Sequence, residues 1–540
     1  MSTTTQAPPT RPPGASVPMS HREVLYALSG LLLAMFVAML SSTVVSTALP
    51  RIVADLHGSE AGYTWVVVAS LLAMTATTPI WGKLADLFSK KLLTQLTLVI
   101  FMAGSVIAGI APDMGALIGA RLLQGVGMGG LTALVQIVIA SMVTPRDRGK
   151  YFGYLGAVFA MATVSGPLIG GLLVDAKWLG SFLPGYMEGQ AWRWCFYVGI
   201  PIAVVAFVVL QKTLHLPTIK REASIDYVGA TLITAGVSAL LIWVSLAGTQ
   251  FAWVSATTAV LLTLGLLLLA AFVYAETKVA EPIIPLRLFR DRTTSLAVFA
   301  SVMVGVAMFG STVFLVQYFQ ISRGMTPTRA GLMTLALVGG VLVSSIATGR
   351  LIAATGIWKR YLVGGGVVMV AGIGLLGMIG PDTSLLRVGA SMTVLGLGMG
   401  AVNQNLVLAV QNNAAQADIG AASSLVAFFR TLGGSIGVSA LGTALGHRVS
   451  SGITEGLARI GVTPPEGSTG SEIPDMTTLP DKIRPVFEGA FADATGYLFR
   501  LAVPFAVLAL IAILLIREVP LRKTIEREDE LEQLAEPVAS

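Results

Sequence analysis

Charged residues are scarce in this chain of 540 residues. Asp, Glu, Lys and Arg together make up 12% of the sequence, whereas hydrophobic residues make up 54%. An average soluble domain carries about 25% charged residues. A chain this long and this poor in charge has too little polar surface to fold in water. We therefore predict an integral membrane protein whose main partner is the lipid bilayer.

Cysteine, histidine and nucleotide-binding motifs are also rare or absent. Cys195 is the only cysteine, which excludes a disulfide within the chain, and the four histidines show no metal-ligand spacing. The sequence has no G-x-x-x-x-G-K-[ST] loop for ATP and no cluster of titratable residues typical of an enzyme. We therefore expect no cofactor, no metal and no catalytic residues. The net charge of +6 comes from basic residues in short loops, so we expect no nucleic-acid partner.

Apolar stretches long enough to cross a bilayer as helices recur along the whole chain. An even number of spans would place both termini on one side of the membrane. The fourteen predicted spans cover residues 24–49, 61–81, 92–111, 115–142, 151–174, 193–213, 226–247, 254–275, 294–319, 328–353, 361–380, 385–411, 419–446 and 497–516.

Lys and Arg gather in the loops that follow the even-numbered spans. Lys90 and Lys91 follow the second span, and Arg146 and Arg148 follow the fourth, whereas the connection 248–253 carries no charge. Loops rich in Lys and Arg stay in the cytoplasm. We therefore predict a multi-pass protein of the plasma membrane with both termini in the cytoplasm.

An internal repeat relates the first six spans to the last six. Gly82-Lys83-Leu84 returns as Gly349-Arg350-Leu351, and the glycine run 125–129 returns at 396–400, so the separations are 267 and 271 residues. This repeat leaves spans seven and eight as an inserted pair.

The repeat and the loop compositions define the expected domains. They are a disordered tail (1–20), an N-terminal half (21–214), a two-helix linker (215–280), a C-terminal half (281–517) with a long external loop (447–496), and a charged tail (518–540). The mixed apolar and basic segment 281–292 is expected to form an interfacial helix.

Four short motifs connect this sequence to a known family. They are GKLADLFSKK (82–91), RLLQG (121–125), SGPLIGG (165–171) and TVVSTALP (43–50). Together with the repeated six-helix halves they resemble the major facilitator superfamily, specifically its 14-helix drug:proton antiporter branch. The first motif departs from the family pattern at Ser89 and Lys90.

The resemblance implies an all-α polytopic membrane protein with two six-helix halves and two linker helices. It further implies secondary active export of drugs or other small lipophilic molecules by alternating access, with proton antiport, in a bacterial inner membrane. Such a protein would contribute to antibiotic resistance. We expect a monomer with a small-molecule substrate and protons as partners. A dedicated exporter or facilitator of one endogenous metabolite, antibiotic or lipid, without the usual proton coupling, remains an alternative.

The loop 82–91 is expected to hold the two halves together on the cytoplasmic side. The Asp86 carboxylate can cap a helix N-terminus and pair with basic residues, while Gly82, Lys90 and Lys91 complete this conformational latch. The alternative is an ordinary surface acid.

The antiporter motif is expected to bend the fifth span. Pro167 removes one backbone hydrogen bond, and Gly166, Gly170 and Gly171 allow close helix contact. Tight packing without a role in transport direction is an equally valid interpretation.

Two arginines lie deep inside predicted spans. Arg121 is about 10 Å from the outer end of span four, and Arg430 is about 16 Å inside span thirteen. A charge at such depth needs a partner or a wet cavity, so both can mark a central pathway. A structural arginine bonded to helix carbonyls or to neighbouring Ser and Gln is the alternative. Other candidate groups for the cavity, for substrate or for coupling are Thr43, Gln124, Gln136, Gln317, Asn403 and Asn405.

The first span lacks the carboxylate that the family usually carries there. Ser41 occupies that position, two residues before Thr43, and no other Asp or Glu lies far from the end of a span. A hydroxyl does not titrate at physiological pH, so the usual proton carrier is absent and substrates are expected to be neutral or anionic.

Overall fold

The computed structural model describes residues 21–522 apart from 59, 177, 179–180, 183–186, 215, 217–224, 249, 461–479 and 481. Within this part of the chain, fourteen helices are long and apolar enough to cross a membrane. This confirms the predicted number of spans and a multi-pass membrane protein. We call the end of the bundle at which α1 (His21–Asp55) begins and α17 (Arg484–Leu515) ends the terminal end, and the opposite end the far end.

The N-terminal half contains six spans. After α1 they are α2 (Glu60–Leu87), α3 (Lys90–Gly109), α4 (Met114–Met142), α5 (Pro145–Asp175), and a last span made of a 3₁₀ turn (Ala191–Arg193), α7 (Trp194–Tyr197) and α8 (Gly199–Thr213). The linker pair is α9 (Tyr227–Leu246) and α10 (Ala256–Glu276).

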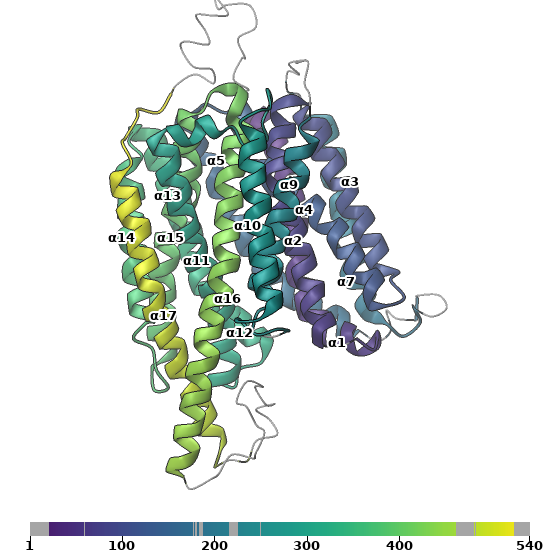
Figure 1. Cartoon of the computed structure of the whole chain (residues 1–540), viewed down its shortest axis with the longest axis vertical. Helices are drawn as coiled ribbons and strands as arrows, with labels where there is room; N and C mark the ends of the chain where they lie inside the picture. The colour runs from purple at the N-terminus through teal and green to yellow at the C-terminus, as the bar shows by residue number, and fades with distance from the viewer. Residues whose placement is uncertain are drawn as a thin grey trace, which may run out of the picture.

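The C-terminal half repeats this pattern before it ends with α17. Its helices are α11 (Arg292–Gln317), a π turn (Tyr318–Ser322), α12 (Pro327–Met333), α13 (Leu335–Thr355), α14 (Lys359–Leu376), α15 (Leu385–Asn413) and α16 (Ile419–Arg459). In Figure 1 the blue N-terminal half and the green and yellow C-terminal half lie side by side. The linker helix α9 packs on α2 of one half and on α16 of the other.

The two halves pack their helices in the same way. In the first half α4 packs against α2 and α3, and α1 packs against α5 and α8; in the second half α15 packs against α13 and α14, and α11 against α16 and α17. The repeated glycines explain this likeness. A Cβ on Gly125 would overlap the carbonyl oxygen of Ser70 in α2, and a Cβ on Gly396 would overlap that of Leu337 in α13. Small residues allow membrane helices to approach this closely.

Two boundaries differ from the prediction. The segment 447–496 is not one long external loop, because α16 continues to Arg459 and α17 begins at Arg484. The proline, glycine and acidic residues of this segment suggested a loop, but polar residues also allow a helix to continue into water. The segment 281–292 contains only a short 3₁₀ helix, Leu286–Arg290, rather than a longer interfacial helix. The tail 1–20 and most of the tail 518–540 lie outside the described residues.

The equivalent glycines predict equivalent effects of mutation. Gly125→Ala and Gly396→Ala should each lower the melting temperature of the purified protein, because overpacking a tight contact costs about 1–3 kcal/mol. Gly119→Ala, on the same helix as Gly125, should have no such effect because no atom lies within 4 Å of its Cβ position. Equal melting temperatures for all three variants would contradict the packing described here.

Candidate functional site

Asp86 joins the two halves at the terminal end. Its Oδ1 accepts a hydrogen bond from the backbone N–H of Gly420 at 2.7 Å, and its Oδ2 accepts one from Ala421 at 2.9 Å. Both donors lie in the first turn of α16, where backbone N–H groups have no partner within the helix. A carboxylate from the N-terminal half therefore caps a helix of the C-terminal half, where the helix dipole also favours negative charge.

Gly82 brings α2 and α16 into direct contact one turn before Asp86. A Cβ at this position would overlap the side chain of Ser424 and lie 2.8 Å from the carbonyl oxygen of Gly420. Any larger residue would push α16 away. The Asp86 carboxylate can therefore reach the α16 backbone only because Gly82 has no side chain.

The second contact between the halves lies between α5 and α13. The backbones of Gly149 and Gly349 touch, since a Cβ on either one would overlap the other. The Arg146 guanidinium donates to the carbonyl oxygens of Ala353 and Ala354, at 3.1 and 3.2 Å, near the C-terminus of α13. A cation suits this end of a helix as an anion suits the other. The N-terminal half thus caps one helix of its partner at each contact.

Ion pairs surround the Asp86 contact. Lys83 Nζ lies 2.5 Å from Glu281 Oε2, and Arg287 donates to both carboxylate oxygens of Asp418 at 2.9 and 3.0 Å. Hydrogen bonding and attraction by Asp418 raise the pKa of Arg287. The segment between α10 and α11 is thereby tied to α2 and to the residue that precedes α16.

Buried side chains extend the contact between the two halves to α15 and to the segment after α17. Arg148, which is fully buried, donates to Gln411 Oε1 of α15 at 3.1 Å, and Gln411 donates to Ser423 of α16 at 2.9 Å. The segment after α17 also joins in. Glu518 accepts from the backbone N–H groups of Trp358 and Lys359 at the start of α14. The carbonyl oxygen of Arg522 accepts from the backbone N–H of Arg146.

Arg121 is the centre of a second polar group, inside the N-terminal half. Its guanidinium donates to Ser70 Oγ at 2.8 Å, to the Val66 carbonyl oxygen at 3.3 Å and to Gln124 Oε1. Gln124 in turn donates to Ser41 at 3.0 Å and to Ser105 at 2.8 Å. The described partners of Arg121 are all neutral, and Arg121 is only 2% exposed. Its partners are thus one helix carbonyl and the side chains of neighbouring Ser and Gln residues.

Arg430 lies in the C-terminal half and is half-buried. It donates to the side-chain oxygen of Asn403 on α15, while the Asn403 amide approaches the sulfur of Met308 on α11. Asn405 donates to the Ala401 carbonyl oxygen of its own helix at 2.6 Å. The sequence placed Asn403 and Asn405 in one group, but only Asn403 has a described contact with Arg430.

The antiporter motif packs on the first-helix motif. A Cβ on Gly166 would overlap Thr43, and one on Gly170 would lie 2.9 Å from the carbonyl oxygen of Val44. The Thr43 hydroxyl donates to the carbonyl oxygen of Ala162, one turn before Pro167, at 3.2 Å. Gly171, in contrast, faces no atom within 4 Å. The two motifs therefore form the contact between α1 and α5.

Of the remaining candidates, Lys90 lies near enough to Asp86 for its charge to act on that carboxylate. Lys91 donates to the carbonyl oxygen of Gln211, and Lys90 is the first residue of α3. Gln136 is buried, and its side-chain oxygen accepts no hydrogen bond from the described residues. Gln317 is half-buried at the end of α11, just before the π turn.

Sequence reasoning did not assign a role in the contact between the halves to Arg146, Glu281, Arg287 or Asp418. The basic residues were used only to orient the chain, and nothing in a single sequence pairs Asp418 with Arg287. The clearest available signal was Asp418 directly before the α16 segment, a position that favours acids.

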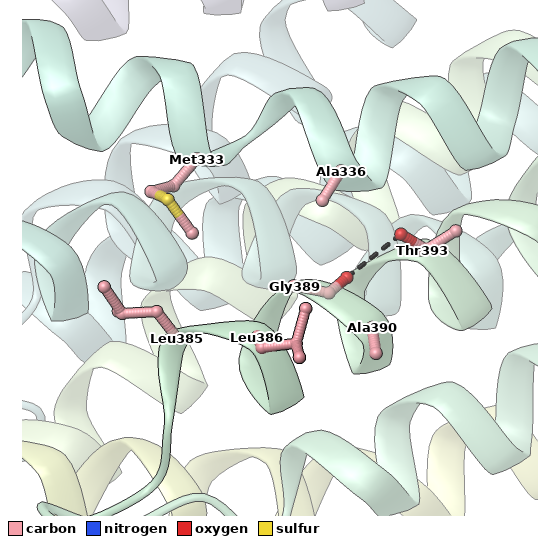
Figure 2. A pocket seen from close by; sticks show the side chains of 7 residues that line it. All are labelled: Met333, Ala336, Leu385, Leu386, Gly389, Ala390 and Thr393. Atoms are coloured by element: carbon pink, nitrogen blue, oxygen red, sulfur yellow. Dashed lines mark hydrogen bonds between the residues drawn. The ribbon is translucent and has the colours of Figure 1, made fainter.

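A surface groove lies far from the Asp86 contact. Figure 2 shows it between the far-end parts of α12 and α13 on one side and α15 on the other. Its walls are apolar, and the hydroxyl of Thr393, its single polar side chain, donates to the Gly389 carbonyl oxygen. None of the candidate residues lines this groove.

Comparisons with known proteins agree on the family. Residues 31–438 match the Major Facilitator Superfamily. The chain is 34% identical to an MFS-type transporter of Mycobacterium tuberculosis over 95% of this chain and 72% of that protein. It is also 34% identical to the multidrug transporter protein MdtP of Bacillus subtilis (80% and 77%) and to the efflux pump dotC of Dothistroma septosporum (93% and 85%).

Solved structures share the fold at low sequence identity. The proton:xylose symporter XylE superposes with a TM-score of 0.62 at 14% identity, covering 96% of this chain and all of that one. The human organic anion transporter MFSD10 gives a TM-score of 0.58 at 13% identity, covering 91% and 99%. The relatives are transporters rather than enzymes, and this chain belongs to the major facilitator superfamily.

Proposed function

We propose that this protein exports small lipophilic molecules, drugs among them, across the plasma membrane by alternating access and proton antiport. The terminal end would face the cytoplasm, as the distribution of basic residues indicates. The similarity to a multidrug transporter and to an efflux pump over most of the chain supports export. The single observation that carries the mechanism is the capping of α16 by Asp86 from the other half.

The two contacts between the halves give this mechanism a physical basis. The α2–α16 and α5–α13 contacts both lie at the terminal end, and each depends on glycines and on one helix-capping side chain. A cap contributes about 0.5–2 kcal/mol. Interactions of this size can close the terminal end and still be broken in every cycle. The described conformation would be the one closed to the cytoplasm.

The polar group around Arg121 would influence which molecules are transported. With Ser41 in place of the usual acid and with neutral partners around Arg121, no described carboxylate in this group would attract a cation. We therefore propose substrates that are neutral or anionic. Arg430 with Asn403, and the polar side chains of Gln136 and Gln317, would provide further weak polar contacts in a largely apolar pathway.

Transport by the purified protein in liposomes tests this proposal. Cationic, neutral and anionic lipophilic dyes would be offered with and without a pH gradient. We expect transport of neutral or anionic dyes that accelerates at least several-fold with the gradient, because proton antiport couples the two fluxes. Equal rates with and without the gradient would instead favour the alternative, a facilitator or dedicated exporter without proton coupling. Fast transport of quaternary ammonium dyes would contradict the substrate preference.

Asp86→Asn should slow transport. An amide has one acceptor oxygen where the carboxylate uses two, and it carries no charge. The state closed at the terminal end therefore loses about 1 kcal/mol, or roughly five-fold in population. The matched control is Asp113→Asn, because Asp113 caps α4 within its own half by accepting from the Ala116 N–H at 2.9 Å. Initial rates in liposomes would be compared. If the two variants lost activity equally, capping between the halves would have no special role.

Ser41→Asp should introduce a titratable carboxylate into the polar group around Arg121. Its carboxylate would replace a hydroxyl that accepts from Gln124, itself bonded to Arg121. We expect the variant to transport cationic dyes better and to change the dependence of the rate on pH, since a carboxylate near a buried guanidinium carries charge where the hydroxyl does not. Rates measured from acid to alkaline pH would show this, and an unchanged profile with unchanged dye preference would show that position 41 is inert.

A further inference from the structure

Two buried carboxylates on the linker helices have no role in the mechanism described so far. Asp226 precedes α9 and Glu276 ends α10, and the two residues are 8% and 4% exposed. Both side chains reach the first turn of α9. A Cβ on Gly229 would lie within 2.9 Å of both Asp226 Oδ2 and Glu276 Oε1. The two carboxylates therefore face the same point in the interior.

The hydrogen bonds of this pair leave one oxygen without a partner. Asp226 Oδ1 accepts from the Gly229 N–H at 2.8 Å, and Glu276 accepts from the N–H groups of Ile283 and Ile284 at 3.1 and 3.3 Å. Asp226 Oδ2 is buried and has no hydrogen-bond partner among the described residues. Leaving a buried carboxylate oxygen unpaired is costly. A proton held between this oxygen and Glu276 would remove that cost.

The surrounding charges also favour a bound proton. Lys83 of α2 is the cation that acts on Glu276, but its ammonium group contacts Glu281 directly. Arg287 also acts on Glu281, so among the described residues the ionised pair of Asp226 and Glu276 would face Lys83 as its cation, and Glu281 already engages that lysine. The other helix against α9 is α16, and its first charged residue is Arg430, eleven residues after it begins. Lys278 at the end of α10 lies over the Tyr274 ring. Like charges that share a poorly hydrated site repel strongly, and binding one proton relieves the repulsion.

We propose that Asp226 and Glu276 form a proton-binding site on the linker helices, in which one proton bridges Asp226 Oδ2 and the Glu276 carboxylate. The proton comes from water at the terminal end and returns to it, and no other bond forms or breaks. This inference deepens the proposed proton antiport and rests on that function for its transport readout. It assigns a chemical role to the two helices that interrupt the repeat.

Lys83 would carry the effect of this proton to the Asp86 contact. It lies three residues before Asp86 on the same helix and directly after Gly82. With the proton bound, Lys83 pairs with Glu281. After its loss, the doubly negative pair competes for Lys83 and pulls on α2 where α2 touches α16. A proton on the linker helices would thereby change the stability of the contact between α2 and α16.

Infrared spectroscopy of the full-length protein tests the bound proton directly. Difference spectra between acid and alkaline pH report the C=O stretch of protonated carboxyl groups. We expect a titrating component of this band in the wild type that is missing from both Asp226→Asn and Glu276→Gln, because either change leaves only one acid of the pair, with no second carboxylate to share the proton. Asn still caps a helix, so Asp226→Asn is expected to fold. The control, Asp147→Asn, removes a half-exposed acid paired with Lys150 and should keep the band.

The same variants in liposomes test the link to transport. Varying the pH on the terminal side, we expect the midpoint of the rate profile to shift by about one unit in Asp226→Asn, but not in Asp147→Asn. Infrared spectra identical in the wild type and both pair variants would overturn the site. A lost band with an unchanged rate profile would overturn the link through Lys83. If wild-type transport did not depend on pH at all while the band behaved as expected, the proposed antiport would fail and the proton site would stand.

Discussion

The cap that Asp86 places on α16 is the interaction on which the arrangement of the two halves depends. A helix N-terminus that begins inside a bundle needs acceptors for its first N–H groups, and here they come from the other half of the protein. The requirement explains why Gly82 must lack a side chain one turn earlier. It also explains the nearby Arg287–Asp418 pair, which fixes the residue just before the capped turn.

The two contacts between the halves are related by the internal repeat but are opposite in chemistry. At α16 an acid accepts from the start of a helix, and at α13 Arg146 donates to the end of one. Both capping residues belong to the N-terminal half. The C-terminal half contributes helix ends whose backbone groups lack partners within the helix. It also contributes the segment after α17, in which the carbonyl oxygen of Arg522 accepts from the Arg146 N–H. Because each cap matches the local helix dipole, the halves bind through many small contributions rather than one strong bond.

The sequence predicted the helices of this fold well and the contacts between them less well. Fourteen apolar runs and the repeated glycines suffice to predict the number of spans and the two halves. A membrane span requires a long apolar run, and close helix packing requires small residues, and both are visible in the sequence. The Asp86 cap could be anticipated from an acid in a basic loop. Ser, Gln and carbonyl partners of Arg121 could be named as an alternative, but its specific contacts with Ser70 and Val66 and the pairing of Asp226 with Glu276 could not, since they join residues from different helices. The helical extensions of α16 and α17 were missed because polar residues indicate where the chain leaves the membrane, but not whether it continues as a helix or as a loop.

A measured distance between the two halves at the terminal end tests the central claim, that Asp86 holds the halves together there. Spin labels at Phe88→Cys and Ile357→Cys would report it, since both residues are 41% exposed, one in each half, and the native Cys195 is buried and can be replaced. In liposomes we expect a dominant short distance with the native Asp86 and a transfer of population to a longer distance in Asp86→Ala. An identical distance distribution in both proteins would contradict the account.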